Sequence, residues 1–103
     1  MNNSLPSATK VVVIGGGVAG CSVAYHLAKF GWKDTILLER DQLTSGTTWH
    51  AAGLIGQLGS SATITKFRKY SLDLYKKLEK ETELSTGLKQ NGAITVATTS
   101  GRL

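Results

Sequence analysis

The sequence has 103 residues, of which 41% are hydrophobic and 18% are charged, and this indicates one small globular unit rather than a disordered chain. No apolar run approaches the roughly 18 residues that a membrane-spanning helix requires, so no transmembrane segment and no membrane partner are expected. The net charge is +5, but six of the Lys and Arg residues share positions 66–83 with four acidic residues. Such a mixture is typical of a solvated helix face with pairs such as Asp73–Lys77, and it does not indicate a nucleic-acid-binding surface.

The first part of the chain predicts a strand, a helix and a second strand. Residues 1–9 form a polar tail, and residues 10–14 are a β-branched run without alternation, which is typical of a buried strand in a parallel sheet. Glycines then turn the chain, residues 18–30 favour a helix, and Gly31 is a natural helix stop. Residues 35–38 predict the second strand, which makes an α/β fold built on a βαβ unit.

The second part of the chain is less regular. Residues 41–61 are rich in Gly, Ser and Thr and are longer than an ordinary connection, so we expect this loop to be functional. Apolar residues recur at helical spacing over residues 64–78, which predicts a long amphipathic helix that stops near Gly87. Residues 92–97 predict a last strand. These elements do not complete a fold, so we expect residues 10–103 to be an incomplete, truncated domain.

A glycine fingerprint follows the first strand and opens the first helix. Gly15, Gly17 and Gly20 have the spacing G-x-G-x-x-G, in which the glycines make the turn, admit a pyrophosphate, and let the helix pack closely on the strand. Glu39 ends the second strand, where a carboxylate accepts hydrogen bonds from the ribose hydroxyls. The predicted cofactor-binding residues here are Gly15, Gly16, Gly17, Val18, Ala19, Gly20 and Glu39. These features alone leave FAD and NAD both open.

Two stretches carry a resemblance to a known family. They are Leu-Leu-Glu-Arg at positions 37–40 and Leu-Thr-Ser-Gly-Thr-Thr-Trp-His-Ala-Ala-Gly-Leu at positions 43–54. The sequence here strongly resembles the flavoprotein family of sarcosine dehydrogenase and dimethylglycine dehydrogenase, and the resemblance continues through residues 70–86 and 91–94. It implies the N-terminal part of a doubly wound, glutathione-reductase-like FAD-binding Rossmann fold with one long extra helix.

The resemblance also implies roles for the loop. In that family the histidine of the Trp-His-Ala-Ala-Gly stretch is joined covalently to the 8α carbon of the flavin, and here that residue is His50. The small residues after it would let the main chain lie against the flavin ring, and the threonines before it would donate hydrogen bonds to the pyrophosphate. The further predicted cofactor-binding residues are Arg40, Thr47, Thr48, His50, Ala51, Ala52 and Gly53.

The activity that the resemblance implies is oxidation of an N-methyl amine such as sarcosine or dimethylglycine. The resulting iminium would be hydrolysed or its carbon passed to tetrahydrofolate, and an electron-transferring flavoprotein or oxygen would take the electrons. No catalytic residue and no metal site are identified, and we expect the chain alone to be inactive. The single cysteine, Cys21, fits a reducing compartment, which would be the cytoplasm, or the mitochondrial matrix in a eukaryote. Two alternatives stay open: an NAD-binding Rossmann domain, which has no use for the loop, and a noncatalytic regulatory fragment of the same fold.

Overall fold

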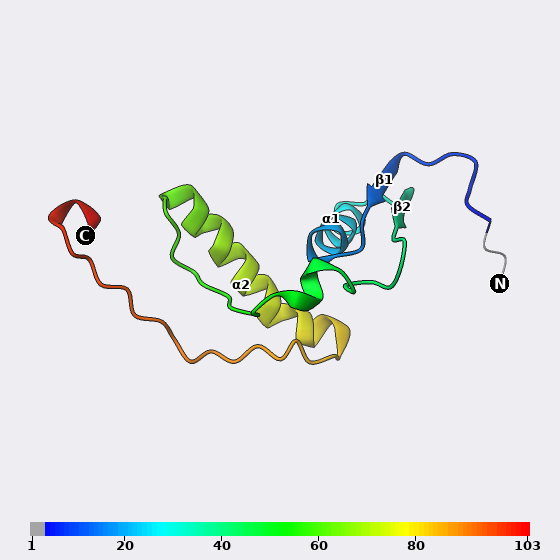
Figure 1. The fold of residues 1–103 in the computed structure, drawn as a ribbon. Helices are drawn as coiled ribbons and strands as arrows, with labels where there is room; N and C mark the ends of the chain where they lie inside the picture. Colours follow the sequence, from blue (N-terminus) through cyan, green and yellow to red (C-terminus); the bar gives the residue numbers. More distant parts are fainter. Residues whose placement is uncertain (1–3) are drawn as a thin grey trace. The chain divides into compact units, whose positions relative to one another are not determined.

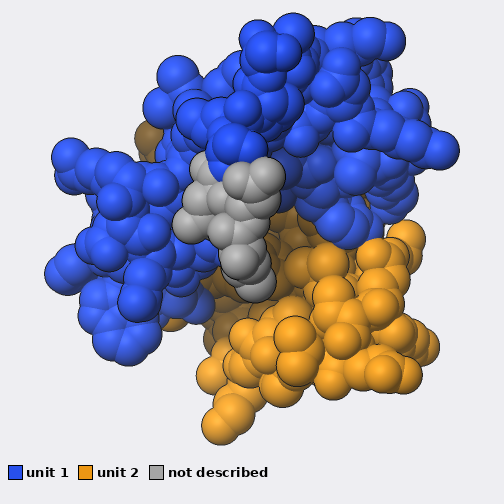
Figure 2. Space-filling model, turned by 90° about the vertical axis from the view of Figure 1, so that its right-hand side faces the viewer, with its two compact units in different colours: residues 1–53 blue, residues 54–103 orange. Residues whose placement is uncertain are grey.

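The computed structural model describes residues 4–103, and it divides the chain into two compact units, residues 1–53 and 54–103 (Figure 2). Residues 1–3 of the predicted polar tail lie outside the described part. The first unit contains β1 (Val11–Ile14), α1 (Val18–Lys29), β2 (Thr35–Leu38) and the 3-10 helix η1 (Thr47–His50). The second contains α2 (Ala62–Thr82) and the 3-10 helix η2 (Ser100–Arg102) (Figure 1). None of the helices described is both long and apolar enough to cross a membrane.

The predicted strand–helix–strand unit is confirmed. β1 and β2 pair in parallel, with Val11 opposite Thr35 and Ile14 opposite Leu38, and α1 contacts both strands. The ladder continues past β1, because the N–H of Gly15 donates to the carbonyl oxygen of Leu38 at 2.8 Å. The first unit is therefore a small α/β arrangement with a two-stranded parallel sheet.

The prediction that the first strand is buried on both faces is wrong for this structure. Val13 is only 9% exposed, whereas its neighbour Ile14 is 85% exposed and Val12 is 49% exposed. Successive side chains of a strand point to opposite faces of the sheet, so Val12 and Ile14 share one face and Val13 points to the other. Only the Val13 face is well covered, which leaves a β-branched strand half exposed.

Helix α1 ends as the sequence predicts. Gly31 has φ +86°, and its N–H donates to the carbonyl oxygen of Ala28 at 3.0 Å. The N–H of Trp32 donates to the carbonyl oxygen of Leu27 at 2.9 Å. These two bonds make a Schellman motif, which satisfies carbonyls that the helix leaves without an intrahelical partner.

Helix α2 begins slightly before the predicted apolar pattern and ends before the predicted stop near Gly87. It begins after Ser61, whose hydroxyl accepts a hydrogen bond from the N–H of Ile64 at 3.3 Å. It ends at Thr82, because Glu83 adopts a left-handed conformation with φ +58°, so the helix stops before it reaches Gly87. The Glu79 carboxylate then accepts hydrogen bonds at 2.9 Å from both the N–H and the hydroxyl of Thr86, which closes the turn.

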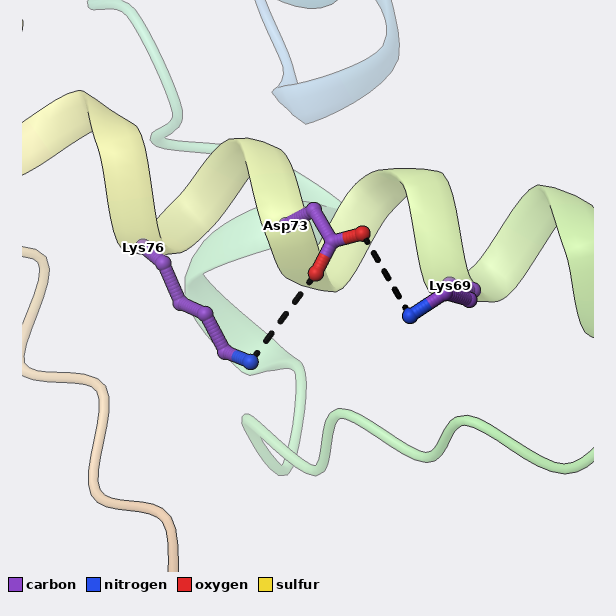
Figure 3. Close-up of polar contacts among 3 residues, drawn as sticks. All are labelled: Lys69, Asp73 and Lys76. Atoms are coloured by element: carbon purple, nitrogen blue, oxygen red, sulfur yellow. Dashed lines mark ion pairs between the residues drawn. The ribbon is translucent and has the colours of Figure 1, made fainter.

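The charged face of α2 carries different ion pairs from the one expected. Asp73 lies 3.7 Å from the Lys69 ammonium and 3.9 Å from the Lys76 ammonium, so it pairs with these residues rather than with Lys77 (Figure 3). Positions three and four apart are neighbours on a helix, and one carboxylate can therefore meet a lysine on each side. All three side chains are well exposed, so each pair contributes little to stability.

The predicted strand over residues 92–97 is wrong. This segment forms no strand, and Ile94 is 95% exposed. A strand needs a partner for its N–H and C=O groups, and in the described residues only β1 and β2 form a sheet. The β-branched residues give the segment a propensity for extended structure, but no neighbouring strand pairs with it in the described residues.

Candidate functional site

The glycine turn between β1 and α1 has the geometry that its spacing predicts. Gly15 has φ +105°, a conformation that side-chain-bearing residues rarely adopt. A Cβ atom on Gly20 would collide with the carbonyl oxygen of Gly15 and would lie 3.5 Å from Cγ1 of Val13. A Cβ atom on Gly17 would lie 3.0 Å from the Thr48 hydroxyl oxygen. The turn therefore brings strand, helix and loop closer together than larger residues would allow.

Glu39 lies against this turn. Its carboxylate accepts a hydrogen bond from the N–H of Gly16 at 2.7 Å and another from the N–H of Asp41 at 3.1 Å. The hydrogen bond from Gly16 first, and that from Asp41 second, lower the pKa of Glu39 below its ordinary value of 4.5. The carboxylate is thus held in its charged form beside the N-terminus of α1.

The loop after β2 folds back onto the same turn. The N–H of Thr44 donates to the carbonyl oxygen of Gly16 at 2.8 Å, and the Thr48 hydroxyl accepts a hydrogen bond from the N–H of Val18 at 2.9 Å. Thr48 lies in η1, a 3-10 turn that the sequence did not predict within this irregular segment. Because Val18 is the first residue of α1, the loop supplies the hydroxyl that satisfies one of the free N–H groups of the helix.

These elements surround a pocket of about 410 Å³. The pocket is lined by Gly17, Glu39, Arg40, Asp41, Ser45, Gly46, Thr47 and Thr48. Five of these were predicted as cofactor-binding residues, from the glycine turn, the end of β2 and the loop, and the structure brings them together. The sequence analysis did not predict Asp41, Ser45 and Gly46 as site residues. Their position between Arg40 and Thr47, which were both predicted, could have indicated them.

The other predicted site residues do not line this pocket. Gly15, Gly16, Ala19 and Gly20 form the turn and the start of α1 beside it. His50 is exposed at the end of η1, and its Nδ1 lies 2.9 Å from the carbonyl oxygen of Gly46. Ala51, Ala52 and Gly53 are likewise exposed, and Gly53 is the last residue of the first unit.

The pocket has the chemistry of a site for a nucleotide diphosphate. Gly17, the N-cap residue of α1, lines the pocket, and the positive end of the helix dipole at this N-terminus favours phosphate groups. Hydroxyls from Thr47 and Thr48 and the Arg40 side chain come from the loop side, while Glu39 provides acceptors suited to sugar hydroxyls. Among residues 4–103 no group of three or more His, Cys, Asp or Glu side chains is placed to hold a metal ion.

Comparison with known proteins identifies the family. Residues 10–103 match the model of the family described as FAD dependent oxidoreductase, DAO. The chain is 45% identical over 102 residues to 4-methylaminobutanoate oxidase (formaldehyde-forming) of Paenarthrobacter nicotinovorans, which covers 99% of this chain and 12% of that protein. It is 49% identical over 100 residues to human mitochondrial sarcosine dehydrogenase, which covers 96% of this chain and 11% of that protein.

One further relative is named as a regulatory subunit rather than as an enzyme. The chain is 44% identical over 100 residues to the mitochondrial pyruvate dehydrogenase phosphatase regulatory subunit of Mus musculus, which covers 97% of this chain and 11% of that protein. The chain thus spans 11% to 12% of the length of these relatives. The predicted resemblance to the family of sarcosine and dimethylglycine dehydrogenases is confirmed, and the chain belongs to the DAO family of FAD-dependent oxidoreductases.

Proposed function

We propose that this chain is the FAD-binding segment of a flavin-dependent oxidoreductase that oxidises N-methyl amines such as sarcosine or dimethylglycine. The observation that carries the proposal is the pocket at the N-terminus of α1, where the glycine turn, Glu39 and the Thr47–Thr48 pair converge in a chain of the DAO family. In this proposal residues 10–103 are part of a larger, doubly wound FAD-binding domain of the glutathione-reductase-like type.

The residues of the pocket would divide the binding of FAD among them. The first turn of α1 and the hydroxyls of Thr47 and Thr48 would hold the pyrophosphate, and Gly17 would leave room for it. The free acceptor positions of the Glu39 carboxylate would accept hydrogen bonds from the ribose hydroxyls, since a carboxylate has more lone pairs than its two present bonds use. Bound FAD would supply the hydride acceptor, which these protein side chains cannot provide.

We propose that His50 is the residue that carries the flavin covalently. A carbonyl oxygen can only accept a hydrogen bond, so the 2.9 Å contact with Gly46 requires the proton on Nδ1 of His50. In the neutral imidazole this leaves the lone pair on Nε2. Nε2 is therefore the atom that we expect to form the bond with the 8α carbon, while the Gly46 carbonyl orients the ring.

The substrate class comes from the names of the relatives. Two of them are named for N-methyl amines, 4-methylaminobutanoate and sarcosine. Removal of a hydride from the N-methyl carbon gives an iminium. Addition of water to the iminium releases formaldehyde and the demethylated amine. Alternatively, the carbon of the iminium is transferred to tetrahydrofolate. Electrons would pass to an electron-transferring flavoprotein or to oxygen.

For a eukaryotic source we propose a mitochondrial location, because the mammalian relatives are named as mitochondrial. For a bacterial source we propose a cytoplasmic location.

A regulatory function is the second candidate. Its support is the 44% identity to the mouse phosphatase regulatory subunit, which is similar to the identity shared with the two enzymes. A protein of this kind would retain the FAD-binding fold and act through a protein partner rather than through turnover of an amine.

The decisive experiment measures cofactor and turnover separately. The purified protein is mixed with FAD or NAD and then freed of unbound nucleotide by gel filtration, and we expect the protein fraction to retain flavin absorption after FAD and no NAD. Gly17→Val should lose the flavin, because a side chain would press on Thr48 and fill the phosphate space, whereas Gly56→Ala should keep it, because a Cβ at Gly56 meets no atom within 4 Å. A protein that binds NAD instead would refute the FAD assignment.

Turnover and linkage are then tested on the FAD-bound full-length protein to which this segment would belong, because we expect residues 1–103 alone to be inactive. Oxidation of sarcosine, dimethylglycine or 4-methylaminobutanoate supports the enzyme, and FAD binding without oxidation of any N-methyl amine supports the regulatory candidate. After acid precipitation, flavin should stay in the pellet and mass spectrometry should find it on the peptide that contains His50. A pellet without flavin would refute the linkage, and flavin retained by His50→Ala would refute the choice of residue.

A further inference from the structure

The main chain of Gly16 is held on both sides. Gly16 is the unspecified position between Gly15 and Gly17 in the fingerprint, yet it is buried. Its N–H donates to the Glu39 carboxylate at 2.7 Å, and its carbonyl oxygen accepts from the N–H of Thr44 at 2.8 Å. The glycine turn is thereby joined to the end of β2 and to the loop at once.

A side chain at this position would disturb both partners. A Cβ atom on Gly16 would lie 2.5 Å from Cδ2 of Leu43, 3.1 Å from Cβ of Glu39 and 3.1 Å from Oε2 of Glu39. The Leu43 side chain is flexible and able to move aside, but Cβ of Glu39 is fixed by the main chain and Oε2 of Glu39 is held by the hydrogen bond that it accepts from Gly16. The absence of a side chain therefore allows the loop and the carboxylate to approach the main chain.

Thr44 has an unusual conformation that serves this contact. Its φ is +66°, and the only other non-glycine residue with positive φ in the described chain is Glu83. A β-branched residue in the left-handed region is strained and persists only where its surroundings hold it. Here the left-handed conformation occurs at the residue whose N–H reaches the carbonyl oxygen of Gly16.

We propose that Glu39 and Thr44 are positioning residues that fix the loop over residues 41–48 on the Gly16 main chain before any nucleotide enters. Glu39 thus has a structural task in addition to its ribose contact, and Thr44, which does not line the pocket, acts only through the loop. The inference rests on the proposed function, in which this pocket binds the ADP part of FAD. A pocket held in this way does not need to order its loop when the nucleotide binds, which strengthens binding.

The first test needs no ligand. Amide hydrogen exchange of the ligand-free protein should show protection of residues 41–48 in the wild type and faster exchange there in Gly16→Ala and in Glu39→Gln. Gly56→Ala is the matched control and should leave exchange in this segment unchanged. Protection of the α1 amides should persist in all variants, which shows that the βαβ unit is still folded. Unchanged protection of residues 41–48 in Glu39→Gln would overturn the proposal.

The second test separates positioning from ribose binding. Affinities for ADP and for 2′,3′-dideoxy-ADP, which lacks the ribose hydroxyls, are measured on the wild type and Glu39→Gln. If Glu39 positions the loop, the variant should weaken binding of both nucleotides by at least about tenfold. If only ADP is weakened, Glu39 binds ribose alone, so the positioning role is wrong and the proposed function stands. A wild type that binds neither nucleotide overturns the proposed function, while amide exchange of the ligand-free protein still decides whether Glu39 positions the loop.

Thr44 is tested by a pair of variants. Thr44→Gly keeps the N–H and favours positive φ, so both nucleotides should bind within about twofold of the wild type. Thr44→Pro removes the N–H and fixes φ near −65°, so it should weaken both by at least about tenfold. Equal affinities for Thr44→Pro and the wild type would overturn the role of Thr44.

Discussion

Replacement of Gly20 by alanine should damage the site without touching the cofactor directly. Gly20 lies in α1, and an added Cβ atom would collide with the carbonyl oxygen of Gly15, with the Gly15 carbonyl carbon only 3.0 Å away. Both atoms belong to the main chain, so no side-chain rotation relieves the clash. The helix must move away from the end of β1, and the glycine turn must move with it.

The size of this effect follows from the contact. An extra side-chain atom in a well-packed site lowers the free energy of unfolding by about 1–3 kcal/mol. We expect a loss of about 2 kcal/mol or more here, because the turn holds the carbonyl of Gly15 in place. Since the N–H of Gly15 pairs with Leu38, the displacement also disturbs the end of the sheet. FAD affinity should fall by at least about tenfold, because the helix N-terminus moves relative to the phosphate position.

Two measurements check this prediction. Urea unfolding gives the change in the free energy of unfolding, and titration with FAD gives the change in affinity. Gly56→Ala is the matched control, and it should be neutral or slightly stabilising, because Gly56 has open space and does not have a positive φ. If Gly20→Ala unfolds at the same urea concentration as the wild type and binds FAD equally well, the argument from close helix–strand packing is wrong.

Three further predictions concern stability. Hydrogen bonds from Gly16 and Asp41 lower the pKa of Glu39 below 4.5, so the contribution of Glu39 to stability is present above that pH and is lost as the pH falls through the lower pKa of the folded state. Urea midpoints measured at several pH values should show this acid-sensitive stability in the wild type and not in Glu39→Gln. Gly31→Ala should destabilise the protein by about 1–2 kcal/mol in urea unfolding, because φ +86° is strained for alanine, and an unchanged midpoint would contradict the Schellman assignment. Ser61→Ala should cost about 1 kcal/mol through the lost N-cap of α2, whereas Ser61→Asp should retain most of the stability.

The sequence predicted those elements whose signal is local. The bounds of β2 are as predicted, and α1 ends one residue before the predicted limit, because Gly31 adopts the left-handed conformation that a helix end requires. The predicted strand over residues 92–97 failed because composition reports only propensity, while a strand also needs a partner. The half-exposed face of β1 was missed for the same reason, since β-branched residues do not specify what covers them.

The site was predictable in its residue types and not in its arrangement. Glu39 was chosen for its place after β2, but its bond to Gly16 joins residues 23 apart, and the bond between Val18 and Thr48 joins residues 30 apart. The periodicity of hydrophobic residues does not predict contacts between residues so far apart in the sequence. The left-handed φ of Thr44 is not predictable from composition either, because threonine rarely adopts this conformation. The role of Gly16 was hidden by the motif itself, which leaves that position unspecified.

The same reasoning explains why fold and activity must be tested apart. The pocket is lined by main-chain groups, hydroxyls, the Arg40 side chain and the carboxylates of Glu39 and Asp41, which in our proposal hold a nucleotide, and nucleotide binding by these groups does not specify which amine is oxidised. Relatives named as enzymes and a relative named as a regulatory subunit share 44% to 49% identity with the chain. Amine turnover must therefore be measured separately from FAD binding.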